Sequence, residues 1–288
     1  MPQLQHPLPS VQSYVDHFSA QPLPVLRHTV RALEALRHSG ESIGARQLAA
    51  IVLADPLMTM RLLTHIERNR RQSQNHDITT IERAVMMLGV EPFFRAFGAL
   101  PTVEKALAAR PKALVGVLRV IARARQVADL ARDFAIVRRD LDVQEITVAA
   151  LLHEATEIVC WIFAPELALQ VQARQAAQPG LRTAEAERAV FGVSAAEIQF
   201  GLVRAWRLPE LLVHLLDDSE QDNPRVRTIQ LAADFARHLA HGWDDPALAD
   251  DIAAIEALLH LGREPLLQRL GMPEAIRPRF LPPAPPTD

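Results

Sequence analysis

The sequence predicts an all-α protein built as two helical lobes, and three observations support this prediction. Apolar residues recur every three or four positions along nearly the whole chain of 288 residues, which is the spacing of one helix face. Alternating strand-like runs between turn pairs are hard to find. Pro101 and Pro111 interrupt the helical pattern and divide it into an N-terminal and a C-terminal set.

The first lobe begins with a helix that Pro22 and Pro24 open and that Ser39-Gly40 ends. The segments "ARQLAAIVLAD" and "LMTMRLLTHIER" predict the next two helices, which meet at the turn Asp55-Pro56. Two long core helices of the second lobe follow from "VLRVIARARQVADLARDFAIV" and "DVQEITVAALLHEATEIVCWIFAP", joined by the polar turn Arg138-Arg139-Asp140. Further helices are expected over 209–216, 225–240 and 246–261.

Two pairs of residues have the spacing of a capping box, in which two side chains satisfy each other's free backbone amides. Thr79 and Glu82 stand at the start of "IERAVMMLG", in which Glu82 is the second residue. Ser194 and Glu197 precede "IQFGLVRAWRL", which Pro209 ends. We expect a helix to begin at each box.

These elements predict four segments. Residues 1–20 form an N-terminal extension, 21–108 the first lobe, 109–277 the second lobe, and 278–288 a proline-rich tail that we expect to be extended.

Composition excludes several classes of protein. With 49% hydrophobic and 23% charged residues, the chain can bury a core and is not disordered. The single cysteine, Cys160, excludes an internal disulfide framework and a chelating cysteine cluster, and fits a reducing compartment. The N-terminus lacks a signal-peptide pattern, and no uninterrupted apolar run reaches membrane-spanning length. We therefore expect a cytoplasmic protein without a membrane partner.

Nucleic acid is not an expected partner either. The sharpest basic cluster is Arg68-Asn69-Arg70-Arg71, which lacks neighbouring aromatic residues and a helix-turn-helix pattern. We interpret it as a solvated loop.

The stretch "LLHEATEIVCW" places His153 beside Glu154 in an apolar helical run, as metal hydrolases do. A zinc protease motif would need a second histidine where Glu157 stands. The structural alternative is a half-buried histidine bonded to a neighbour such as Glu157, one helical turn later.

Cys160 lies in an apolar context that raises a thiol pKa, so we expect structural burial. Four methionines are expected to fill the core, with a partner groove as the alternative: Met58, Met60, Met86 and Met87.

The order of these pieces resembles the HDOD domain of bacterial signalling proteins. The resemblance extends from about Gln21 to about Leu261, and its motifs are Asp55-Pro56, Arg61-Leu62-Leu63, and the spacing of Ile81, Ala84 and Leu88-Gly89. It implies an all-helical, two-lobed HDOD fold whose C-terminal lobe is a degenerate form of the HD metal-dependent phosphohydrolases. Those hydrolases bind metal through a histidine, a His-Asp pair and a later aspartate.

The resemblance places the pair on His153-Glu154, the later aspartate on Asp234, and the first histidine on or near Arg123. Further histidines of the hydrolases fall on Ala195 and on the stretch 217–220. An arginine cannot be deprotonated to bind a metal, and Glu154 is longer than aspartate by one methylene group. The resemblance therefore implies no metal, no cofactor and no catalytic residue.

We expect a cation to replace the metal. The guanidinium of Arg123 would point into the space between His153, Glu154 and Asp234; an alignment shifted by two residues would assign this role to Arg125.

We expect a non-catalytic signal-transduction module that acts through protein partners, because no receiver or diguanylate cyclase domain is expected in this chain. Two alternatives remain open. One is a residual metal-dependent phosphodiesterase. The other is a receptor that binds a small ligand such as a nucleotide in the former metal cavity, without turnover.

Overall fold

The computed structural model describes residues 2–39, 42–69, 79–178, 180–220 and 222–281. Over these residues the regular structure is helical, and the extended backbone pairs at one bridge, between Val25 and Thr102. The predicted all-α class is confirmed.

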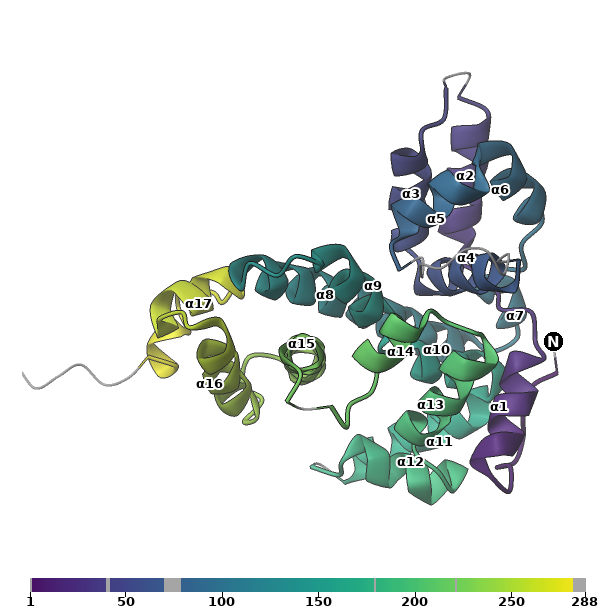
Figure 1. Ribbon diagram of the computed structural model, residues 1–288. Coiled ribbons are helices and arrows are strands. Elements are labelled where there is room, and N and C mark those ends of the chain that lie inside the picture. Colours follow the sequence, from purple (N-terminus) through teal and green to yellow (C-terminus); the bar gives the residue numbers. More distant parts are fainter. Residues whose placement is uncertain (1, 40–41, 70–78, 179, 221, 282–288) are drawn as a thin grey trace, which may run out of the picture.

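One group of helices lies apart at the top of Figure 1, where α2 and α5 each pack on α3 and α4 contacts both α3 and α5. Its members are α2 (Arg27–Arg37), α3 (Ala45–Leu53), α4 (Pro56–Arg68), α5 (Ile81–Leu88) and α6 (Val90–Ala96). The short helix α7 (Val103–Ala106) leads from this group to the rest of the molecule.

Asp55 ties this first group together at the predicted Asp-Pro turn. Its buried carboxylate caps α4 by accepting from the backbone amides of Leu57 and Met58. The other carboxylate oxygen accepts from the amide of Leu26 at 2.8 Å and from the hydroxyl of Thr29 at 2.7 Å. One side chain therefore fixes the start of α4 against the start of α2.

The larger group is arranged around the long helix α8, against which α9, α10, α11 and α15 pack. Its helices are α8 (Pro111–Val137), α9 (Val143–Leu152), α10 (Ala155–Phe163), α11 (Pro165–Ala177), α12 (Thr183–Phe191), α13 (Ala195–Ala205), α14 (Glu210–Leu215), α15 (Pro224–Leu239), α16 (Leu248–Leu259) and α17 (Arg263–Arg269). Trp161 of α10 lies directly on the backbone of α8, because a Cβ atom added at Gly116 would come within 2.4 Å of its ring.

The prediction of one continuous helix over 142–165 is wrong at two residues. The helix divides into α9 and α10 at His153 and Glu154. The amide of His153 bonds to the carbonyl of Ala150, a shorter turn than that of an α-helix, and Glu154 adopts φ −90° and ψ 8°. The interruption falls on two residues whose side chains make contacts outside this segment, Glu154 with Arg123 of α8 and His153 with Asp218 of the loop before α15.

The two predicted capping boxes have different outcomes. The box of Ser194 and Glu197 is confirmed at the start of α13. The box at Thr79 is wrong, because α5 begins after Thr80 and the Thr79 hydroxyl donates to Glu145 Oε1 of α9 at 2.5 Å. Thr79 links the two groups of helices instead of capping one.

The N-terminal segment packs into the larger group. Helix α1 (Val11–Ser19) lies against α13 and buries Tyr14, Val15 and Phe18. The Tyr14 hydroxyl accepts from the amide of Leu8 and donates to the carbonyl of Phe191, each at 2.8 Å. Residues 2–20 of the predicted extension are thus part of the packed structure, while the four segment boundaries stay a prediction.

The burial of individual side chains tests the predictions for Cys160 and for the four methionines. Cys160 is buried, as predicted. Met58 and Met60 are fully buried, but Met86 is 61% exposed and Met87 is 40% exposed, so the prediction of core methionines is wrong at these two positions. Arg70 and Arg71 of the basic cluster lie outside the described residues, as do residues 282–288 of the tail.

One described segment, Val143–Phe163, is long and apolar enough to cross a membrane by length and composition alone. This segment comprises α9 and α10, and 83% of the apolar window is buried inside the protein. Burial at this level is that of a core segment.

Candidate functional site

An ion-pair network joins α8, α10 and α15 at the helix interruption. Arg123 projects from α8, and its Nε donates to Glu154 Oε2 at 3.1 Å. Its Nη2 donates both to Glu154 Oε2 and to Glu157 Oε2. The side chain of Glu154 is 2% exposed and that of Arg123 is 17% exposed. The carboxylate of Glu154, which is almost completely shielded from solvent, is thus bound by an arginine from a neighbouring helix.

Arg237 of α15 is a second cation in this network. Its Nη2 lies 3.6 Å from Glu154 Oε1, and its Nη1 lies 3.3 Å from Asp234 Oδ1. Asp234 is 45% exposed and is connected to Glu154 through Arg237. Among the described residues, no hydrogen bond or ion pair joins Asp234 to His153 or to Arg123.

His153 contacts a different partner from the one expected. Its Nε2 lies 3.4 Å from Asp218 Oδ1, and its Nδ1 lies 4.0 Å from Glu154 Oε1. Burial lowers the pKa of His153, but the hydrogen bond and charge of Asp218 outweigh burial and raise it. The alternative of a bond to Glu157 is not what the structure has, since Glu157 bonds to Arg123.

The charges of these groups follow from their neighbours. Burial raises the pKa of Glu154, but Arg123 and Arg237 outweigh burial and hold it at about 2. Glu157 differs, because burial together with the charge of Glu154 raises its pKa despite Arg123. Glu154 is therefore the anionic centre of the network at neutral pH.

The residues present do not fit a hydrolase metal centre. The oxygens of Glu154 that would coordinate an ion face the guanidinium groups of Arg123 and Arg237. Ala195 supplies no donor side chain. Across the described ranges, no three His, Cys, Asp or Glu side chains are grouped so that they could hold a metal ion. The arrangement supports charge neutralisation by arginine and not activation of a metal-bound water.

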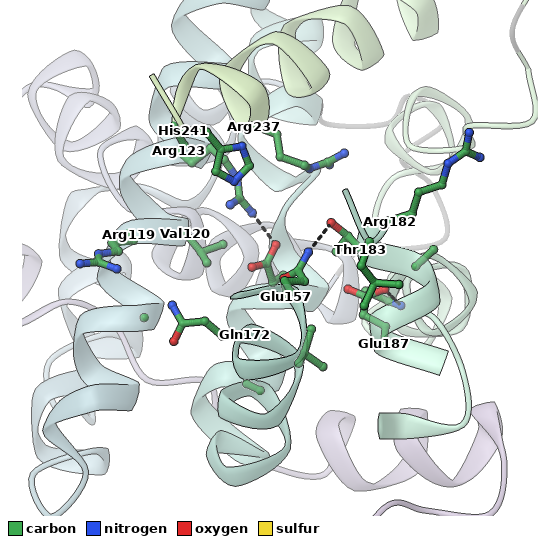
Figure 2. Close-up of a pocket in the computed structure, with 18 of the residues that line it drawn as sticks. Arg119, Val120, Arg123, Glu157, Gln172, Arg182, Thr183, Glu187, Arg237 and His241 are labelled. Carbon is green, nitrogen blue, oxygen red and sulfur yellow. Dashed lines mark hydrogen bonds and ion pairs between the residues drawn. The ribbon is translucent and has the colours of Figure 1, made fainter. Parts of the chain in front are cut away.

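A cavity of about 1440 Å³ lies beside the network (Figure 2). Its walls come from α8, α10, α11, α12, α13 and from the end of α15 with the loop that follows. Arg123, Glu157 and Arg237 line it, so the ion-pair network forms part of the wall. Gln175 Nε2 donates to Thr183 Oγ1 at 3.1 Å across another part of the wall.

Glu187 of α12 is a further acidic group in this cavity. Its side chain accepts from the amide of Ala195 at 2.8 Å, and the residue is 9% exposed. Burial raises the pKa of Glu187 to about 7, and the negative charge of Glu157 adds to this effect. The carboxyl group is therefore poised to gain or lose a proton near neutral pH.

Sequence reasoning missed Arg237, Glu187 and the role of Asp218. Arg237 stands three residues after Asp234, one turn of the same helix, so that spacing was a usable signal. Glu187 carries no such signal, because nothing nearby in the chain indicates that α12 turns it toward α10.

A model of the HDOD domain matches residues 23–221. The search of curated proteins found no match for the sequence.

Two solved structures illustrate the similarity of fold. The MmoQ response regulator from Methylococcus capsulatus is 20% identical, and the match covers 88% of this chain and 99% of that chain with a TM-score of 0.63. A virulence factor from Campylobacter jejuni is 19% identical, with 95% of this chain and 98% of that chain covered and a TM-score of 0.64. At these identities the similarity concerns the fold alone.

Proposed function

Because this chain belongs to the HDOD family, whose model matches more than two-thirds of it, we propose that it is a non-catalytic regulatory module that signals through protein partners. The expected HDOD fold is confirmed by the match and by the solved structures above. The absence of catalysis and the protein partners are our proposal.

The observation that supports the proposal most is the pairing of Arg123 with Glu154. In a metal-dependent phosphohydrolase the carboxylate at this place would coordinate an ion that activates water. Here both of its oxygens face arginine side chains, Arg123 on one side and Arg237 on the other. A protein that converted its metal site into a structural ion pair would keep the fold as a scaffold for contacts with other proteins.

The name of one similar structure supports the signalling class. The Methylococcus protein is named a response regulator. We extend that role to this chain as part of the proposal, and we place the module in the cytoplasm, where its buried single thiol Cys160 would stay reduced.

Metal content and hydrolysis test this proposal together. Purified protein should retain substoichiometric manganese, iron, zinc or magnesium after dialysis. It should not hydrolyse cyclic dinucleotides, nucleoside triphosphates or nucleoside monophosphates when these metals are added. The variant Arg132→Ala, on the exposed face of α8, serves as a matched preparation control.

The opposite outcome is equally specific. Stoichiometric metal that survives dialysis, together with turnover that His153→Ala abolishes and Arg132→Ala retains, would show that the protein is a phosphohydrolase and not a non-catalytic regulatory module.

A further inference from the structure

Glu187 is a buried acid without a cationic partner. One of its oxygens accepts the amide of Ala195, and no other hydrogen bond or ion pair to a described residue involves its carboxyl group. With 9% of the residue exposed, water can solvate it only from the cavity that it lines. A buried carboxylate in this position is costly unless a charge or further donors reach it.

The neighbouring arginines are already engaged. Arg123 bonds to Glu154 and Glu157, and Arg237 pairs with Glu154 and Asp234. Both arginines are thus paired with Glu154, Glu157 or Asp234, and neither is paired with Glu187. A further positive charge beside this cluster would be stabilised, and Glu187 is the carboxyl group that has no positive partner among the described residues.

The cavity is large enough to bring that charge in on a small molecule. Ligand pockets commonly measure roughly 300–1,000 Å³, and this cavity is larger, at about 1440 Å³. Apolar side chains in its wall can cover a hydrocarbon body: Val120, Trp161, Phe191 and Ile198. Figure 2 shows Glu157 and Glu187 near the middle of the lining residues, with Arg237 above them in the view.

The other charged groups of the wall favour a cation at Glu187 over an anion elsewhere. Arg119 and Arg182 are exposed, so water already stabilises their charges. His238 pairs with Asp251, and His241 pairs with Asp245. Cys160, which also faces Glu187, is a thiol whose pKa burial raises, so it brings no positive charge.

We propose that this cavity binds a small organic molecule with a protonated amino group, which forms an ion pair with Glu187 while its apolar body lies against the wall. The inference deepens the regulatory function proposed above by giving the module a class of ligand. It depends on Glu187 and not on the metal-site positions, so binding of an amine and lack of hydrolysis can succeed or fail independently.

Isothermal titration calorimetry with the full chain tests the proposal. Butylamine and putrescine are the amine probes, and 1,4-butanediol is a neutral molecule of the same length as putrescine. At pH 7.5 at least one amine should bind and the diol should not. Glu187→Gln should weaken amine binding by about tenfold or more, which corresponds to about 1.4 kcal/mol. The glutamine oxygen can still accept the amide of Ala195, so the variant should fold.

The matched control is Glu185→Gln, on the same helix but exposed, which should bind amines as the wild type does. A second readout is proton release. Without a ligand, the carboxyl group of Glu187 has a pKa of about 7, whereas the ion pair with an amine requires the ionised carboxylate. Below about pH 7, amine binding to the wild type should therefore release a proton and should weaken as the pH falls. Glu187→Gln should lose both effects.

Three results would overturn the proposal: no binding of either amine, equal binding of the diol, or unchanged amine binding in Glu187→Gln.

Discussion

Arg123 neutralises two carboxylates at once, which makes it the residue on which the ion-pair network depends most. Its guanidinium donates to Glu154, which directly precedes α10, and to Glu157 of α10. Because Glu154 is 2% exposed, water cannot take over this role if the arginine is removed.

Arg123→Ala should therefore destabilise the protein by roughly 3–5 kcal/mol, the usual cost of leaving a buried charge without its partner. Urea unfolding measures this loss as a lower midpoint at unchanged slope. The effect should shrink on acidification. The folded pKa of Glu154, about 2, lies below its ordinary 4.5, so the stability that this pair contributes is present above pH 4.5 and is lost as the pH falls toward 2.

Arg125 and Arg132 provide the comparison on the same helix. Arg132 is more than half exposed and pairs with Asp129 at the surface, so Arg132→Ala should stay within about 0.5 kcal/mol of the wild type. Among the residues that the structure describes, no hydrogen bond or ion pair joins the half-buried Arg125 to the network, so Arg125→Ala should cost less stability than Arg123→Ala. If neither Arg123→Ala nor Arg125→Ala loses more than about 1 kcal/mol, the idea of a substitute cation is wrong.

Glu187 should make the stability of the protein depend on pH in the opposite sense. Its folded pKa is about 7, above the ordinary 4.5, so the folded protein keeps a proton that the unfolded chain has already released. Stability contributed by this group is present below pH 4.5 and is lost as the pH rises through 7, by up to about 3 kcal/mol. Relative to the wild type, Glu187→Gln should gain stability between pH 5 and pH 8, as followed by thermal unfolding; an unchanged difference contradicts this assignment.

At the scale of the elements, most helices were predictable and one interruption was not. Apolar spacing and the prolines predicted α2, α3, α4 and α8, because a core-facing helix must repeat its apolar residues every three or four positions. The same spacing continues through His153 and Glu154, so it could not indicate that the chain turns there. The turn is associated with contacts to Arg123, Arg237 and Asp218, which local periodicity does not contain.

The close contact between α8 and α10 gives a prediction for Gly116. Alanine favours a helix over glycine by about 1 kcal/mol, but a Cβ atom here would lie 2.4 Å from the ring of Trp161. Trp161 is 6% exposed and cannot move aside freely. Gly116→Ala should therefore lower the unfolding midpoint in urea despite its better helix propensity.

A double-mutant cycle separates packing from propensity. In the background Trp161→Leu, which removes the ring, Gly116→Ala should become neutral or stabilising. The same loss in both backgrounds would mean that the contact with Trp161 is not the cause.

At the scale of the whole molecule, residues 2–20 pack across the larger group of helices. Tyr14 and Phe18 are fully buried, and the amide of Leu4 donates to the carbonyl of Phe163 at 2.7 Å. Their burial was missed because the segment is short and rich in polar residues, and its partner α13 lies far along the chain.

Removing residues 1–20 should therefore destabilise the entire protein, because it uncovers the apolar face of α13. Tyr14→Phe should cost less, about 1–3 kcal/mol, since it leaves the Leu8 amide and the Phe191 carbonyl without their partner. Thermal unfolding of both forms checks this order; a truncated chain as stable as the wild type would show that the segment is dispensable.

The candidate site as a whole was only partly predictable. The resemblance to the family directed attention to Arg123 and Glu154, which the structure brings together. Asp234 was expected to face the same cation, yet it meets Arg237 instead. Such differences arise because a side chain that has lost a metal pairs with whichever charge the packing of distant helices brings near it, and a single sequence does not contain that packing.

The two carboxylates that bond to Arg123, those of Glu154 and Glu157, also matter before the protein has folded. During synthesis, Val143–Phe163 leaves the ribosome before Arg237 has been made, as an apolar stretch of the length that membrane-insertion machinery recognises. Each ionised side chain near the centre of such a stretch costs roughly 2.5–3.5 kcal/mol on insertion. Glu154 and Glu157 lie near that centre. We therefore expect the carboxylates that later bond to arginine to keep the newly made segment from being mistaken for a membrane anchor.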